Sequence, residues 1–186
     1  MRIIGGKFRS RMLAEFSGDA VRPTSDRAKE SLFNILALKI PQSRVLDLFS
    51  GSGAIGLECL SRGAREVVFN DFSKESIGIL KKNLNALKVE IGREAKIFNY
   101  DYSTCLNALT GEFDFVFIDP PYRYDYGVPA MEKIVARGLL SNDGVIVYER
   151  DKPFEGEVEG LEQYDERKYG KTYLTFFKRK KEDERE

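Results

Sequence analysis

Residues 44–56, RVLDLFSGSGAIG, place a short apolar run directly before a glycine-rich turn. The run at 44–49 has the length and composition of a buried strand, and residues 54–62 continue as a helix. The spacing Gly51-x-Gly53-x-x-Gly56 lets the backbone bend tightly and approach a ligand without Cβ clashes. This order of strand, glycine turn and helix predicts a nucleotide-binding loop of an α/β fold. The alternative is an ordinary connection between a strand and a helix.

The rest of the chain alternates between strand-like and helix-like segments. Strands separated by helix-sized segments predict a mostly parallel sheet with helices on both faces. A hairpin that turns at Gly170 adds an antiparallel strand at one side. The further predicted strands are 66–70, 95–99, 113–118, 145–149, 162–169 and 172–177, and the further predicted helices begin at the N-cap Ser73 and around residue 129.

The composition excludes several kinds of catalytic site. The chain has 186 residues, with 30 basic and 30 acidic side chains and no histidine. Ser-His-Asp and Cys-His nucleophiles and histidine-ligated zinc or haem are therefore excluded, and we expect no metal. Cys59 and Cys105 lack a C-x-x-C spacing, which predicts reduced thiols in a cytoplasmic protein. No apolar run approaches the roughly 18 residues of a membrane-spanning helix, so we expect no membrane partner.

The neutral net charge is a sum over a basic beginning and an acidic later stretch. The first eleven residues contain four bases and no acid, with Phe8 among the bases. This pattern predicts a strip that binds nucleic-acid phosphates, whereas the alternative is a solvated surface. We expect the acidic stretch from Glu149 to Glu166 to face away from RNA. The bases of the strip are Arg2, Lys7, Arg9 and Arg11.

Residues 22–26, RPTSD, predict the start of a helix. The free amides of this helix start can hold a phosphate or the region of a target base, with Arg22 and Thr24 beside it. We expect residues 1–40 to form an extension that binds RNA, 41–178 the main domain and 179–186 a charged tail. The apolar face of the predicted helix carries Ala28, Leu32, Phe33, Ile35 and Leu36.

Two acids, Asp47 and Asp71, occur within or at the end of predicted strands next to the glycine loop, where a cofactor would bind. Asp71 ends the second predicted strand, where a carboxylate can accept hydrogen bonds from ribose hydroxyls. Asp47 lies within the first strand, and a buried carboxylate needs a positive or hydrogen-donating partner. The amino and sulfonium charges of S-adenosylmethionine would suit Asp47, and so would the amides of the loop. The loop alone does not separate S-adenosylmethionine from a dinucleotide.

The tetrapeptide Asp119-Pro120-Pro121-Tyr122 follows the strand at 113–118. Ligands of open α/β sheets bind beyond the carboxyl ends of strands, so we expect the tetrapeptide to share a crevice with the glycine loop. Its rigid Pro-Pro unit fixes a carbonyl and the Asp119 carboxylate as two acceptors for an exocyclic amino group. Tyr122 offers a ring for base stacking, and Asp119 can take the surplus proton. The alternative is a proline-rich loop with a surface tyrosine.

These stretches together resemble a known family. Asp47-Leu-Phe-Ser-Gly-Ser-Gly, Asp71 and the Asp119 tetrapeptide are similar to class I S-adenosylmethionine-dependent methyltransferases that modify exocyclic nitrogens. Residues 2–11, RIIGGKFRSR, and 22–34, RPTSDRAKESLFN, resemble the N-terminal signature of the bacterial 16S ribosomal RNA guanine-N2 methyltransferase family. The resemblance runs from Met1 to about Phe177.

The resemblance implies a Rossmann-like sheet of seven strands with an antiparallel last strand. It implies that Asp71 binds the cofactor ribose, that Asp101 contacts the adenine amino group and that Phe72 packs on the adenine. A core or rim position is the alternative for Phe72. Asp71 stands where many relatives carry glutamate, which shortens the reach by one methylene. The implied cofactor-binding residues are Asp47, Phe49, Ser50, Gly51, Gly53, Asp71, Phe72, Asp101 and Asp119.

The resemblance also implies methyl transfer from S-adenosylmethionine to N2 of a guanine in 16S ribosomal RNA. The partner is that RNA or the assembling small ribosomal subunit, and we expect a monomer. Asp119, Pro120, Pro121 and Tyr122 would act at the reacting amino group, and Arg123 would contact RNA. The runner-up is an adenine-N6 nucleic-acid methyltransferase. Further alternatives are a protein-glutamine methyltransferase, an NAD-dependent oxidoreductase and a non-catalytic RNA-binding protein.

Overall fold

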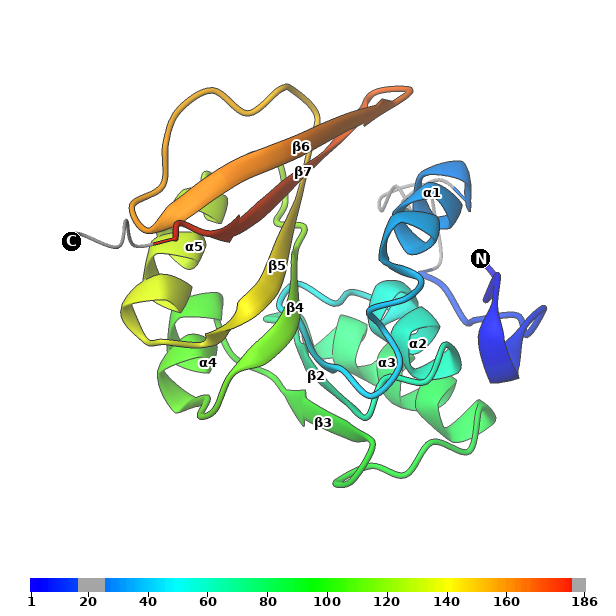
Figure 1. Ribbon diagram of the computed structural model, residues 1–186. Helices are drawn as coiled ribbons and strands as arrows, with labels where there is room; N and C mark the ends of the chain where they lie inside the picture. Colours follow the sequence, from blue (N-terminus) through cyan, green and yellow to red (C-terminus); the bar gives the residue numbers. More distant parts are fainter. Residues whose placement is uncertain (17–25, 182–186) are drawn as a thin grey trace.

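The computed structural model describes residues 1–16 and 26–181, and of residue 26 only the backbone; the expectations for Arg22 and Thr24 fall outside these residues. A seven-stranded sheet has the order β3-β2-β1-β4-β5-β7-β6 (Figure 1). β7 is antiparallel to both neighbours, and the pairs among β1 to β5 are parallel, which confirms the predicted architecture. The strands are β1 (Arg44–Asp47), β2 (Glu66–Asn70), β3 (Ala95–Phe98), β4 (Phe113–Ile118), β5 (Leu140–Arg150), β6 (Leu161–Tyr169) and β7 (Thr172–Arg179). The helices are η1 (Gly6–Phe8), α1 (Asp26–Leu36), α2 (Ala54–Ser61), α3 (Lys74–Ala86), α4 (Tyr102–Ala108) and α5 (Gly127–Ala136).

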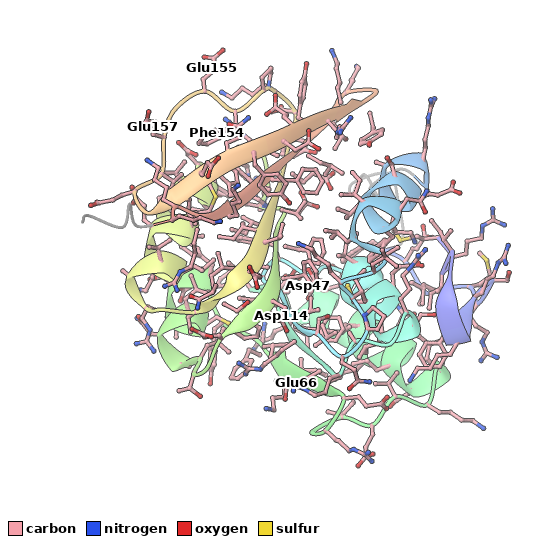
Figure 2. All side chains as sticks on the ribbon, viewed as in Figure 1. Asp47, Glu66, Asp114, Phe154, Glu155 and Glu157 are labelled. Atoms are coloured by element: carbon pink, nitrogen blue, oxygen red, sulfur yellow. The ribbon has the colours of Figure 1, made fainter. Side chains whose placement is uncertain are left out.

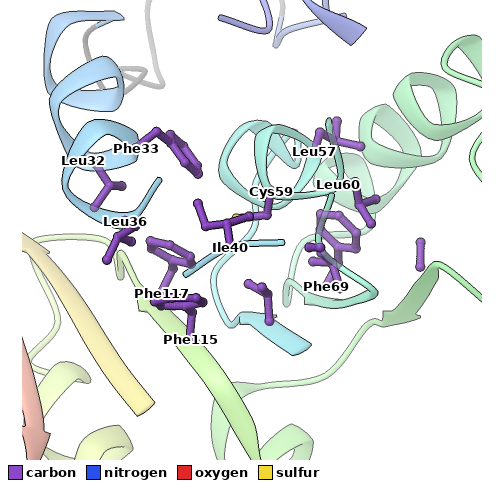
Figure 3. Close-up of a cluster of buried hydrophobic side chains, with 14 of the residues drawn as sticks. Leu32, Phe33, Leu36, Ile40, Leu57, Cys59, Leu60, Phe69, Phe115 and Phe117 are labelled. Carbon is purple, nitrogen blue, oxygen red and sulfur yellow. The ribbon is translucent and has the colours of Figure 1, made fainter. Parts of the chain in front are cut away.

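Two hydrophobic cores lie on the two faces of the sheet. On one face, α1, α2 and α3 enclose a core that includes Phe33, Phe115 and Phe117 (Figure 3). On the other face, α4 and α5 cover sheet residues such as Leu46 and Val116. Because side chains alternate along a strand, each strand contributes to both cores. With both faces covered, the carboxyl edge of the parallel strands is the part of the sheet that is left for a ligand.

Three local predictions are wrong. β5 begins at Leu140 instead of at Val145, because Leu140 already pairs with Phe113 before the register shifts. The helix α4 lies between β3 and β4, where the short, weakly periodic segment predicts none. Ile35 is 42% exposed instead of buried, because it lies beside the row of core positions on α1 that includes Leu32 and Leu36.

The N-terminal residues 1–16 are fixed on α2 and α3 by hydrogen bonds. The carboxylate of Glu58, buried in α2, accepts hydrogen bonds from the amides of Ile4 and Gly5, both at 2.8 Å. The side chain of Asn83 in α3 accepts a hydrogen bond from the amide of Ala14 at 2.7 Å and donates one back to the carbonyl of Ala14 at 3.1 Å. The N-terminal segment therefore packs on the helix that begins at the glycine loop.

Candidate active site

The loops after β1, β2 and β4 meet at one edge of the sheet. Strand-like hydrogen bonds continue just past β1: the amide of Leu48 donates to Phe117 at 3.1 Å, and that of Ser50 donates to Asn70 at 2.9 Å. Between β1 and β4 the strand order changes direction, and such a switch point opens a crevice for a ligand. The glycine loop, the residue after β2 and the tetrapeptide after β4 therefore flank one crevice.

Asp71 is held by the glycine loop and by the start of α3. Its Oδ2 accepts a hydrogen bond from the amide of Gly51 at 2.8 Å, and its Oδ1 accepts one from the amide of Ser73 at 2.8 Å. The side chain of Asn99 donates to the backbone carbonyl of Asp71 at 2.8 Å. Each carboxylate oxygen keeps a further lone pair, so Asp71 can still accept hydrogen bonds from a ribose.

The glycine loop leaves open space next to an unsatisfied hydroxyl. Gly51 and Gly53 have left-handed φ values of 53° and 86°. A Cβ on Gly53 would lie 2.4 Å from Cδ1 of Leu80, whereas a Cβ on Gly51 would meet no heavy atom of the described residues within 4 Å. The buried Oγ of Ser50 has no hydrogen-bond partner within 1–16 and 26–181. Because a buried hydroxyl without a partner is costly, this loop fits a polar ligand such as S-adenosylmethionine.

Asp47 ends β1 and is 5% exposed (Figure 2). Its Oδ2 accepts a hydrogen bond from the amide of Gly56 at 2.9 Å, so the loop-amide partner is present. Burial raises the pKa of Asp47 to about 7, although the hydrogen bond from Gly56 lowers it, and the nearby charge of Asp71 raises it further. A cationic group in the crevice would favour the ionised carboxylate. Binding of a cofactor amino group by Asp47 stays a prediction.

The tetrapeptide presents Asp119 and Tyr122 to the crevice while Pro120 is buried. Asp119 is solvent-exposed, and the loss of part of its surrounding water raises the pKa of its carboxyl above the usual range. The charges of Glu149 and Asp47 raise this pKa further. Tyr122 is half-exposed, and burial and Glu149 raise its pKa too, so the phenol stays neutral. A neutral, half-exposed ring is suited to base stacking.

The acidic stretch from Glu149 to Glu166 does not face away from the crevice as a whole, contrary to expectation. Glu149 is buried near the end of β5, where its charge raises the pKa of Asp119. Glu155 and Glu157, by contrast, lie on the outer loop between β5 and β6 and point outward (Figure 2). The expectation is wrong because the charge run begins inside a strand, so its acids divide between the crevice and the surface.

An aromatic cluster beside the tetrapeptide is missed by the sequence reasoning. The ring of Tyr126 stacks on Phe49 with centroids 6.5 Å apart and on Tyr124 at 4.9 Å, and it lies 5.1 Å from Tyr102. Arg123, predicted to contact RNA, is exposed and lies with its guanidinium 4.8 Å from the ring centroid of Tyr124. Tyrosines at alternate positions of 122–126 are the sequence signal that points to this cluster. Phe49 therefore packs in this cluster just after β1, and its contact with a cofactor stays a prediction.

Asp101 and Phe72 lie at the carboxyl ends of β3 and β2. The Asp101 carboxylate accepts hydrogen bonds from the Thr104 hydroxyl at 2.6 Å and the Thr104 amide at 2.9 Å, and these lower its pKa. Asp101 is therefore ionised and keeps lone pairs for an adenine amino group. Phe72 is 80% exposed, which excludes the core interpretation. Packing of Phe72 on an adenine and a rim position both agree with this exposure.

The four N-terminal bases, Arg2, Lys7, Arg9 and Arg11, all have exposed side chains. Lys7 forms an ion pair with Glu94, with Nζ and Oε1 3.0 Å apart. Arg11 donates to the last backbone carbonyl of α3 at 3.0 Å. The segment that carries these bases lies beside α2 and α3 (Figure 1), so the strip stays a predicted phosphate-binding surface there.

Replacement of Gly51 by alanine should weaken cofactor binding. We expect the loss in binding free energy to exceed the loss in the free energy of unfolding. A left-handed alanine costs about 1 kcal/mol, and its methyl group would also project into the open space of the loop. Gly138 is a matched control, because it has φ 60° and open space at its Cβ but follows α5. Calorimetric titration with S-adenosylhomocysteine should show weaker binding for Gly51→Ala and unchanged binding for Gly138→Ala. Equal affinities would contradict the assignment of the loop.

The described residues contain neither a membrane-spanning helix nor a metal site. Within 1–16 and 26–181, no helix is long and apolar enough to cross a membrane. The same part of the chain holds no group of three or more histidine, cysteine, aspartate or glutamate residues suited to a metal ion. Cys59 and Cys105 are both free and buried.

The strand order, the glycine loop after β1 and the tetrapeptide after β4 define a Rossmann-like methyltransferase. The chain belongs to the family described as conserved hypothetical protein 95, whose model matches residues 1–178.

Known relatives agree with this class. The ribosomal RNA small subunit methyltransferase D of Haemophilus influenzae is 38% identical over 157 residues, which are 82% of this chain and 81% of that protein. A candidate rRNA methyltransferase of Bacillus subtilis, YlbH, is 35% identical over 97% of this chain and 100% of its own length. A solved structure of a candidate methyltransferase from Escherichia coli, yhhF, is 33% identical with a TM-score of 0.85, and 96% of this chain and 97% of that chain are covered.

Proposed function

We propose that this chain transfers a methyl group from S-adenosylmethionine to N2 of a guanine in 16S ribosomal RNA. The observation that carries the proposal is the tetrapeptide at Asp119, which flanks the same crevice as the glycine loop. Similarity to proteins named ribosomal RNA small subunit methyltransferase D supports RNA as the substrate. The exposed bases Arg2, Arg9 and Arg123 support it as well.

We expect a different residue of the crevice to bind each part of the cofactor. S-adenosylmethionine, when bound, supplies a methyl group on a positively charged sulfur. Asp47 would bind its amino group and Asp71 its ribose, while Asp101 would accept a hydrogen bond from its adenine. Ser50 and Gly51 would line the loop against it, since the hydroxyl of Ser50 is unsatisfied and the position of Gly51 is open.

The tetrapeptide would position the target amino group. The Asp119 carboxylate and a carbonyl of the Pro-Pro unit accept its two hydrogens, which turns the nitrogen lone pair away from the ring and toward the methyl donor. Tyr122 stacks on the base, which has to be unstacked from its RNA neighbours to reach the crevice. Asp119 then takes the surplus proton, because its raised pKa makes it a better proton acceptor than an ordinary carboxylate. Positioning accounts for most of the acceleration.

The proposal extends to the partner and its placement. The extension at 1–40 binds RNA, the domain at 41–178 carries out the transfer, and residues 179–186 form a charged tail. The substrate is 16S ribosomal RNA, free or in the assembling small subunit, and the enzyme acts as a cytoplasmic monomer. No metal takes part.

Nucleoside analysis tests this proposal. Small ribosomal subunits that lack the modification are incubated with the protein and labelled S-adenosylmethionine, and the RNA is digested to nucleosides. We expect the label in N2-methylguanosine. Label in N6-methyladenosine would contradict the guanine assignment, and binding of NAD in place of S-adenosylhomocysteine would contradict the methyltransferase as a whole.

A further inference from the structure

A cavity of about 370 Å³ adjoins the tetrapeptide on the side of the C-terminal hairpin. This volume falls in the range of ligand-binding pockets. The proposed transfer uses one of its lining residues, Tyr122, and leaves the rest of the cavity without a role. The cavity is lined by Tyr122, Asp151, Lys168, Gly170, Lys171, Thr172 and Tyr173.

The hairpin turn lies at the same edge of the sheet as Asp119. β7 pairs with β5 so that Tyr173 lies opposite Arg150, the last residue of β5. The turn at 170–171 therefore projects past the carboxyl end of β5. In Figure 1 this turn lies on the same side of the molecule as α1. The hydroxyls of Tyr169 and Ser31 are hydrogen-bonded, which ties the turn to α1. The residue just before the turn is thus attached to α1.

The lining combines cations with aromatic rings. Lys168 and Lys171 are both exposed, against one carboxylate, Asp151, among the described lining residues. The Nζ of Lys168 lies 5.1 Å from the ring centroid of Tyr173. Lysines beside aromatic rings are the combination that binds single-stranded nucleic acid, since the cations attract phosphates and the rings stack on bases.

We propose that this cavity binds the nucleotide next to the target guanine in the RNA. Its phosphate lies against Lys168 and Lys171, and its base or sugar lies against Tyr173. Because Tyr122 belongs to both the tetrapeptide and the cavity wall, a base stacked on Tyr122 would lie next to the cavity, where the adjoining nucleotide can enter. The inference rests on the proposed function, because it assumes that the target is a base in RNA.

The test removes the two cavity lysines together. For Lys168→Ala/Lys171→Ala we expect the KM for RNA to rise on the order of tenfold, with kcat and S-adenosylhomocysteine affinity nearly unchanged. The salt dependence of RNA binding should weaken by about 0.7 in log–log slope, because the two lysines contact one phosphate of a single strand. Fluorescence anisotropy with a labelled RNA fragment measures this binding without catalysis.

A matched control lies at the other end of the same hairpin. Lys178→Ala/Lys180→Ala removes the same charge from β7 and the residue after it, away from the cavity, and should leave the KM and the salt slope close to those of the unchanged protein. Equal effects of both pairs, or no effect of the cavity pair, would overturn the inference. Methyl transfer by the unchanged protein in the same assay reports separately on the proposed function. If transfer fails while anisotropy still separates the two pairs, the function is wrong and the RNA-binding cavity stands.

Discussion

Replacement of Asp119 by alanine should lower the rate of methyl transfer on the order of a thousandfold. The carboxylate is one of two acceptors that orient the target amino group, and it also takes the surplus proton. Asp119 is not among the groups that hold the glycine loop, since the amides of Gly51 and Gly56 donate to other carboxylates. Affinity for S-adenosylhomocysteine, measured by calorimetric titration, should therefore change little.

Asp119→Asn separates the two roles of this side chain. The amide oxygen still accepts a hydrogen bond, but the group can no longer take a proton. With aspartate, the capacity to take a proton is present above the raised pKa and is lost as the pH falls through it, so the rate should fall on the acid side. The asparagine variant should be slower at every pH, and its rate should not show this fall on the acid side of the pH profile (the acid limb). An active alanine variant, or an unchanged acid limb in the asparagine variant, would contradict the account of the tetrapeptide.

Much of this fold and crevice can be predicted from local sequence. The run at 44–56 predicts β1, the glycine loop and α2 because burial, turn chemistry and helix periodicity agree there. The tetrapeptide is placed correctly because two prolines end a strand and because carboxyl ends of parallel strands share an edge. The position of Asp71 at this edge is predicted in the same way, because Asp71 follows the second strand. Its hydrogen bonds with the amides of Gly51 and Ser73 fix the orientation of the carboxylate, which the sequence spacing alone does not give.

What the sequence misses depends on contacts between distant residues. Glu149 reads as one acid of a charged run, and its place beside Asp119 follows only from the pairing of β5 with β4. The stacking of Tyr126 on Phe49 joins two loops that are far apart in the chain. The cavity is missed for the same reason, because it forms between Tyr122 and a hairpin turn some fifty residues later.

Replacement of Glu58 by alanine should destabilise the fold by about 3–5 kcal/mol. This fully buried carboxylate accepts a hydrogen bond from Arg62 Nε at 2.8 Å, besides those from the amides of Ile4 and Gly5. The ammonium of Lys29, also fully buried, lies 3.7 Å from Glu58 Oε2. The substitution removes the carboxylate that faces this buried cation and leaves two amides without their acceptor. Chemical denaturation measures the loss in the free energy of unfolding.

Glu90→Ala is the matched control, because Glu90 and Arg93 form an exposed ion pair with a separation of 3.2 Å. Exposed ion pairs contribute about 0–1 kcal/mol to the free energy of unfolding. The unfolding midpoint of the Glu90→Ala variant should therefore hardly change. The two variants should also differ in whether the N-terminal segment comes away from the rest of the fold. Because Glu58 holds Ile4 and Gly5, its loss should expose residues 1–16 to proteolysis before the sheet unfolds, and RNA affinity should fall if the bases of this segment contact RNA. Equal stability of the two variants would show that the buried carboxylate does not hold the N-terminal segment in place.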